Sequence, residues 1–210
     1  MPRKSIEYVP GQSVHLIRRG INRCTIFRDD VERGVFVNMF EHAAAKYGLS
    51  VHGFVLMDTH YHALVTPLGP DALTETTRSL NERYVRYVNR KHERIGTLWT
   101  NSPTTIAIDT EQYWLTCLRY IEQNPLRAGM VVDPAEYRWS SYRTHAFGER
   151  SEWLVEHELY RRLGRTPEER QVAYRAICGV PITDEELALL RNRPMMRRPS
   201  LAASQSVAVA

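Results

Sequence analysis

The chain has 210 residues, which is enough for one domain with a hydrophobic core and a smaller addition. No apolar run approaches the roughly 18 residues that a membrane-spanning helix needs, and no apolar signal segment follows the basic N-terminus, so we expect a cytoplasmic protein without a membrane partner. The three cysteines, Cys24, Cys117 and Cys178, lie far apart, which argues against a disulfide framework or a thiolate zinc site.

The net charge is only +4, but the basic residues are unevenly distributed. Residues 1–28 contain six basic side chains against one acidic residue, and residues 78–94 contain another six against two. Most of the basic residues are arginines, whose planar guanidinium can give a phosphate two parallel hydrogen bonds. The clusters favour a polyanionic partner, although each one could instead be a solvated surface.

The first part of the chain predicts a strand, a helix and a β-hairpin. Residues 13–20 form the strand, and glycine and asparagine follow it at turn positions. Apolar residues recur at helical spacing from residue 29 or 30 to residue 47, and a glycine stands just past the end. Residues 49–57 and 60–66 predict two strands joined by a tight turn at Asp58 and Thr59.

The next part predicts a helix from residue 70 to about 92, an irregular stretch, and a short strand over 104–108. A third helix begins at Asp109 or Thr110 and ends near residue 124, because proline at 125 disfavours helical geometry in the residue before it. Asp133 and the proline after it predict another helix start.

The order β-α-β-β-α-β-α resembles the split β-α-β layout, so we expect an α+β, ferredoxin-like fold whose antiparallel sheet carries its helices on one face. We assign residues 1–147 to this domain, 148–195 to a C-terminal helical extension and 196–210 to a disordered tail.

Two histidines on the third predicted strand are candidate metal ligands. Side chains alternate along a strand, so His60 and His62 point to one face and Tyr61 points to the other. Two imidazoles on one face can bind a single divalent ion. The alternative is a pair of exposed histidines without a ligand.

A tyrosine and an asparagine lie together on the third predicted helix. Its apolar stripe consists of Trp114, Cys117, Leu118 and Ile121. Tyr120 and Asn124 fall at the margins of this stripe, and their i, i+4 spacing lets both side chains reach one point. The alternative for Tyr120 is a structural ring with a solvated hydroxyl.

Five ordered motifs resemble those of the REP-associated tyrosine transposases, a group of single-tyrosine HUH endonucleases. The histidine motif is Met57–Pro67 and the tyrosine motif is Arg119–Val131. The others are Leu80–Tyr84, Gly96–Trp99 and Tyr137–Tyr142, and nearer the start His15, Arg19–Arg23 and Ile26–Phe27 also fit. The resemblance covers about residues 8–147.

The resemblance implies an HUH domain in which His60 and His62 hold Mg²⁺ or Mn²⁺ and Tyr120 attacks DNA. It also implies that Asn124 supplies a further metal ligand. Attack by tyrosine would create a phosphotyrosine link and free a 3′-hydroxyl, and because the link conserves bond energy the DNA can later be resealed.

The implied partner is single-stranded DNA whose palindromic repeats fold into hairpins, bound by a monomer or a homodimer. The candidate DNA contacts from the basic clusters are Arg18, Arg19, Arg23, Arg83, Arg86, Arg90 and Lys91. Tyr84, Tyr87 and Trp99 lie near these arginines and could stack on bases. The plainer interpretation puts Tyr84 in the core and Trp99 beneath a loop.

One departure from the family pattern keeps other functions open. Thr100–Pro103 stands where family members usually carry a Gln-Gly-Arg-like segment, and Thr59 stands where asparagine is common. The chain could therefore be a domesticated, catalytically silent protein that binds DNA or RNA hairpins. A second alternative is a metal-dependent hydrolase that uses the histidines with water as the nucleophile.

Overall fold

The computed structural model describes residues 7–100, 102–191 and 193–196. In this described part, four strands form one antiparallel sheet in the order β2-β3-β1-β4. The strands are β1 (Val14–Arg19), β2 (Leu49–Met57), β3 (His60–Pro67) and β4 (Thr104–Ala107). The β1 strand lies between β3 and β4, as the split β-α-β layout requires, so the predicted ferredoxin-like core is confirmed.

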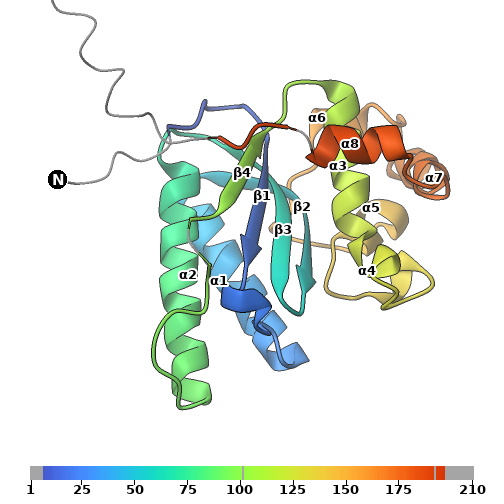
Figure 1. The fold of residues 1–210 in the computed structure, drawn as a ribbon. Helices are drawn as coiled ribbons and strands as arrows, with labels where there is room; N and C mark the ends of the chain where they lie inside the picture. The colour runs from blue at the N-terminus through green and yellow to red at the C-terminus, as the bar shows by residue number, and fades with distance from the viewer. Residues whose placement is uncertain (1–6, 101, 192, 197–210) are drawn as a thin grey trace, which may run out of the picture.

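One face of the sheet is covered by α1 (Asp30–Tyr47) and α2 (Ala72–Lys91), which pack side by side (Figure 1). The predicted signals delimit α1: the Asp29 side chain accepts a hydrogen bond from the Glu32 amide, and Gly48 ends the helix with a φ of 72°. Tyr84 of α2 is fully buried on this face, and its hydroxyl donates to the Ile26 carbonyl oxygen at 2.7 Å. Tyr84 is therefore a core residue.

The expectation of helices on one face only was incomplete, because α3 (Glu111–Glu122) packs on the opposite face (Figure 1). The strand residues on that face are also apolar, among them Val55, Leu64 and Ile106. An apolar sheet face is stable only when another element buries it. The remaining helices on this side are α4 (Asn124–Arg127), α5 (Tyr142–Phe147), α6 (Glu158–Arg161), α7 (Pro167–Cys178) and α8 (Asp184–Arg191).

Two predicted helix boundaries differ from the structure. The helix expected to end near residue 124 ends at Glu122, and Asn124 begins the separate turn α4, with Pro125 in its first turn. The helix expected from Asp133 is only the 3₁₀ turn η2 (Pro134–Glu136). It stops where the backbone of Tyr137 becomes extended, and the Tyr137 hydroxyl donates to the Leu56 carbonyl oxygen of β2 at 2.6 Å.

Both outer strands are paired with irregular chain. Along β2, Leu56 N donates to the Trp139 carbonyl oxygen at 2.9 Å and Ser141 N donates to that of Phe54 at 3.0 Å. Along β4, Met196 N donates to the Thr105 carbonyl oxygen at 2.8 Å. These contacts reduce the exposed backbone edge of the sheet.

The C-terminal helices pack on α3 and share its core. Arg119 of α3 and Gln123, which follows the helix, donate to the carbonyl oxygens of Val180 and Cys178 respectively, each at 2.7 Å. The buried Tyr174 of α7 belongs to the same hydrophobic cluster. The division of the chain at residue 147 stays a prediction, and of the expected disordered tail all residues after Met196 lie outside the described part.

Two further expectations concern membranes and thiols. None of the helices in the described part combines the length and apolar character that crossing a bilayer requires. Cys24, Cys117 and Cys178 are free thiols, as their spacing predicts.

Candidate active site

The two candidate metal ligands lie at the start of β3, on the face that carries α3. The ring centroids of His60 and His62 are 5.1 Å apart, while Tyr61 is fully buried on the α1–α2 face. The turn that precedes His60 is held by the loop after β1. Gly20 N donates to the Thr59 carbonyl oxygen at 2.8 Å, and Ile26 N donates to that of Asp58 at 2.7 Å.

The hydrogen bonds of both histidines leave the same nitrogen available. His60 Nδ1 lies 3.1 Å from Thr59 Oγ1, and His62 Nδ1 lies 2.9 Å from His15 Nε2. Burial lowers the pKa of His60 to about 4, and it holds the pKa of His62 well below its ordinary value of 6.5. Both rings are therefore neutral at pH 7, the form in which imidazole binds a metal. When the ring proton is on Nδ1, the Nε2 atom of each ring has a lone pair for a cation.

Tyr120 of α3 packs against His62 and against His15 of β1. Its ring meets His62 edge-on with centroids 5.9 Å apart, and it meets His15 in the same way at 6.2 Å. The guanidinium carbon of Arg127 lies 5.0 Å from the centre of the Tyr120 ring. The partly buried Tyr120 thus contacts both the buried histidines and an exposed cation.

Asn124 turns its amide group back onto the end of α3. Its Nδ2 atom donates to the carbonyl oxygens of Tyr120 at 2.9 Å and Ile121 at 3.4 Å. This leaves Oδ1 as the atom that could face a cation. The described residues contain no group of three or more His, Cys, Asp or Glu side chains placed to hold a metal, so a cation at His60 and His62 would need amide, water or phosphate oxygen as well.

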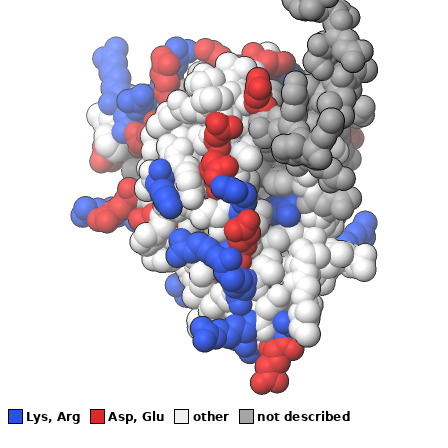
Figure 2. All heavy atoms as spheres, turned by 90° about the vertical axis from the view of Figure 1, so that its left-hand side faces the viewer, with Lys and Arg blue, Asp and Glu red and all other residues white. Residues whose placement is uncertain are grey.

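The basic residues predicted on α2 are mostly solvent-facing. Arg83, Arg86 and Arg90 are exposed, and Lys and Arg side chains gather toward the lower half of the α1–α2 side of the molecule (Figure 2). Lys91 is exposed as well, but its ammonium group lies 2.7 Å from Asp29 Oδ2 and 3.1 Å from Glu32 Oε1. Its charge is already paired within the protein, which makes it a poorer phosphate contact than its neighbours.

The basic residues near the end of β1 fall into two groups. Arg19 and Arg23 are exposed, and Arg19 pairs with His60 in the β1–β3 register. Arg18 points to the other face, where it is only 9% exposed and its guanidinium carbon lies 5.5 Å from the Trp99 ring centre. Trp99 is itself packed in the core and only 4% exposed, so it offers little surface for a base, although it lines a hollow of 560 Å³ together with Arg18.

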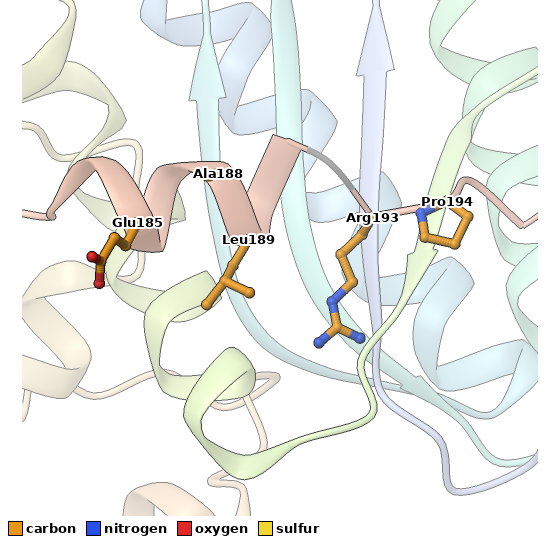
Figure 3. A pocket seen from close by; sticks show the side chains of 5 residues that line it. All are labelled: Glu185, Ala188, Leu189, Arg193 and Pro194. Carbon is orange, nitrogen blue, oxygen red and sulfur yellow. The ribbon is translucent and has the colours of Figure 1, made fainter.

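A hollow of 690 Å³ lies beside α8. Its lining residues are Glu185, Ala188, Leu189, Arg193 and Pro194 (Figure 3). Leu189 and Arg193 point into the same space (Figure 3). Arg193 forms an ion pair with Asp109 and lies 4.5 Å over the Tyr113 ring, so its charge is already matched. Nothing in this lining resembles a catalytic set.

Sequence reasoning assigned no role to three residues that the structure brings to the site. Arg127 stands seven residues after Tyr120, which in a continuous helix places two side chains on the same side two turns apart, but the chain breaks between α3 and α4, so this signal is only partial. Thr59 precedes His60 directly. His15 reaches His62 only through the pairing of β1 with β3, for which no local signal exists.

Comparisons with known proteins were made for the whole chain. The family model described as "Transposase IS200 like" matches residues 8–124. A solved REP-associated tyrosine transposase bound to a REP hairpin is 14% identical, covers 75% of this chain and 93% of its own, and has a TM-score of 0.59, which shows a shared fold. No curated protein matches the chain.

Two other solved structures are similar with lower scores. A putative transposase from Deinococcus radiodurans R1 is 19% identical over 53% of this chain and 89% of its own, with a TM-score of 0.40. The tRNA(His) guanylyltransferase from Saccharomyces cerevisiae is 12% identical over 88% of this chain and 84% of its own, with a TM-score of 0.45. Likeness at these scores carries no argument about this chain.

Proposed function

Because this chain belongs to the IS200-like transposase family, we propose that it cuts and rejoins single-stranded DNA with Tyr120 as the nucleophile. The observation that carries the proposal is the position of Tyr120, whose ring lies edge-on to His62 and beneath the guanidinium of Arg127. A tyrosine that only filled space would not need the imidazoles of His62 and His15 and the exposed guanidinium of Arg127 around its ring.

In the proposed reaction, the Tyr120 hydroxyl oxygen attacks the phosphorus of one phosphodiester, and the bond from phosphorus to the 3′ oxygen breaks. The proton that Tyr120 loses is matched by the one that the departing 3′ oxygen gains. The phosphotyrosine link keeps the energy of the broken bond, so a 3′-hydroxyl can later attack it and reseal the strand. Arg127 is placed to balance negative charge on the phosphate during the attack.

The same proposal includes a divalent cation, Mg²⁺ or Mn²⁺, held by Nε2 of His60 and of His62, with Oδ1 of Asn124 as a further ligand. The donor set fits, because both imidazoles are neutral and both Nδ1 atoms are already hydrogen-bonded. When bound, such a cation would polarise the scissile phosphate.

We propose that the DNA is a single strand containing a hairpin. The similar transposase of known structure is bound to a REP hairpin. In this chain, exposed arginines lie both on α2 and at the end of β1 near His60, which suits a folded strand that contacts phosphates on more than one side.

The test is covalent capture of labelled single-stranded DNA that carries the hairpin repeats flanking the gene. The protein is incubated with this DNA and Mn²⁺ and then run on a denaturing gel. We expect a shifted protein–DNA band that disappears with chelator, with Tyr120→Phe and with His60→Ala. Tyr87→Phe, a partly buried tyrosine on α2, serves as the matched control and should keep the band.

Two outcomes would replace the proposal. Cleavage that persists in Tyr120→Phe would indicate a hydrolase that uses water. Tight hairpin binding on a native gel without any covalent band in folded wild-type protein would indicate a silent hairpin-binding protein.

A further inference from the structure

His15 is the second residue of β1 and faces α3, on the same side of the sheet as His62. Its Nε2 atom is 2.9 Å from His62 Nδ1, and the two rings stack with centroids 5.1 Å apart. Both side chains are buried, at 2% and 4% exposed. His15 also packs against the Tyr120 ring. It therefore contacts one proposed ligand and the proposed nucleophile without facing solvent.

The hydrogen bond between these two rings determines which nitrogen of His62 is free. With both rings neutral, only one of the two facing nitrogens can carry the shared proton. If His62 donates from Nδ1, its Nε2 keeps a lone pair and can bind a cation. If His15 donates, His62 must carry its own proton on Nε2, and that nitrogen cannot be a ligand. Cation binding therefore requires His15 to be the acceptor.

The other nitrogen of His15 argues against a purely structural role. His15 Nδ1 is buried and has no hydrogen-bond partner among the described residues. The cross-strand neighbours of His15 are the apolar residues Leu64 and Ile106. A leucine at position 15 would suit these neighbours and avoid the cost of an unpaired buried polar atom. The free-energy cost of the unpaired Nδ1 atom is explained if the Nε2 atom has a function in the site.

We propose that His15 is a positioning residue, which holds His62 in the tautomer and orientation that present Nε2 to the cation. This inference rests on the proposed function, since it presumes a cation at His60 and His62. Substitution of a residue that hydrogen-bonds to a metal-bound histidine typically lowers the metal affinity by about 10–100-fold, and we expect an effect of this size.

The test is Mn²⁺ binding to the full chain without DNA, measured by isothermal titration calorimetry. His15→Leu fills the position but removes the acceptor, and we expect the Kd to rise about 10–100-fold. His15→Gln keeps an acceptor oxygen near the position of Nε2 and should restore most of the affinity. His52→Leu removes another buried histidine, on β2, and should leave the Mn²⁺ affinity unchanged.

Equal affinity in wild type and His15→Leu would overturn the inference, and so would an equal loss in His15→Leu and His15→Gln, which would indicate a structural role. If His60→Ala bound Mn²⁺ as tightly as wild type, His60 would not be a ligand of the cation. That result would contradict the proposed function itself. If His15→Leu does not fold, long-range ¹H–¹⁵N spectra of wild type with Mg²⁺ decide: a His62 proton on Nδ1 supports the inference, and one on Nε2 overturns it.

Discussion

The guanidinium carbon of Arg127 lies 5.0 Å from the centre of the Tyr120 ring, although the two residues belong to different helices. We predict that Arg127→Gln slows strand cleavage about 10–100-fold, because one cation beside the reacting phosphate is lost. Thermal stability should hardly change, since Arg127 is exposed. Single-turnover cleavage with saturating protein measures the rate.

The control for this variant is Arg143→Gln, which removes an exposed arginine of α5 that pairs with Glu149. It should leave the rate unchanged. A full cleavage rate in Arg127→Gln would show that the cation over Tyr120 has no part in the reaction.

Exposed and internally paired cations on α2 should differ in their contribution to DNA binding. We predict that Arg83→Gln and Arg86→Gln each lower the slope of log K against log salt by about 1, since each removes one phosphate contact. Lys91→Gln should leave the slope unchanged, because its ammonium group is bound to Asp29 and Glu32. Fluorescence anisotropy with a hairpin oligonucleotide at several salt concentrations gives the slopes. Similar slopes for all three variants would contradict this assignment.

A buried carboxylate ties α3 to the helices behind it. Glu122 accepts hydrogen bonds from Ser141, from His145 Nδ1 at 2.7 Å and from the Tyr174 hydroxyl at 2.6 Å. We predict that Glu122→Ala lowers the free energy of unfolding by roughly 3 kcal/mol or more, because these buried groups lose their partner. Urea unfolding measures the change.

Glu111→Ala is the matched control, since Glu111 stands on the same helix but pairs with Arg162 at the surface. Its stability should stay close to that of wild type. If both variants were equally stable, Glu122 would not anchor α3.

The buried His52 should make stability depend on pH. Its Nδ1 lies 2.7 Å from the Val155 carbonyl oxygen, and burial lowers its pKa from 6.5 to about 4. Between these values the unfolded chain binds the proton more readily than the folded one, so the free energy of unfolding falls as pH drops below 6.5 and levels off below about 4. From pH 7 to pH 5 this group contributes a loss of roughly 2 kcal/mol.

The measurement is urea unfolding of wild type and His52→Gln at both pH values. The variant should be less stable at pH 7 but lose less on acidification, because glutamine does not titrate. An identical pH dependence in the two proteins would rule out His52 as a contributor.

Features that depend on neighbouring residues were predictable from the sequence. The alternation of a strand put His60 and His62 on one face, and the element order with its caps and turns predicted the strands and the first two helices. Tyr120 could be placed at the margin of a helix from the 3.6-residue period. The repeats of strands and helices span only a few residues. The face on which a side chain lies can therefore be predicted without knowing what the chain packs against.

Features that depend on contacts between distant parts of the chain came only from the tertiary structure. The approach of His15 to His62 joins residues 47 positions apart through the β1–β3 register. The second helical layer, the burial of Arg18 beneath Trp99 and the internal pairing of Lys91 also arise from long-range packing. A local pattern shows that a residue can bind a metal or a phosphate; only the packing of distant elements decides which partner each side chain meets.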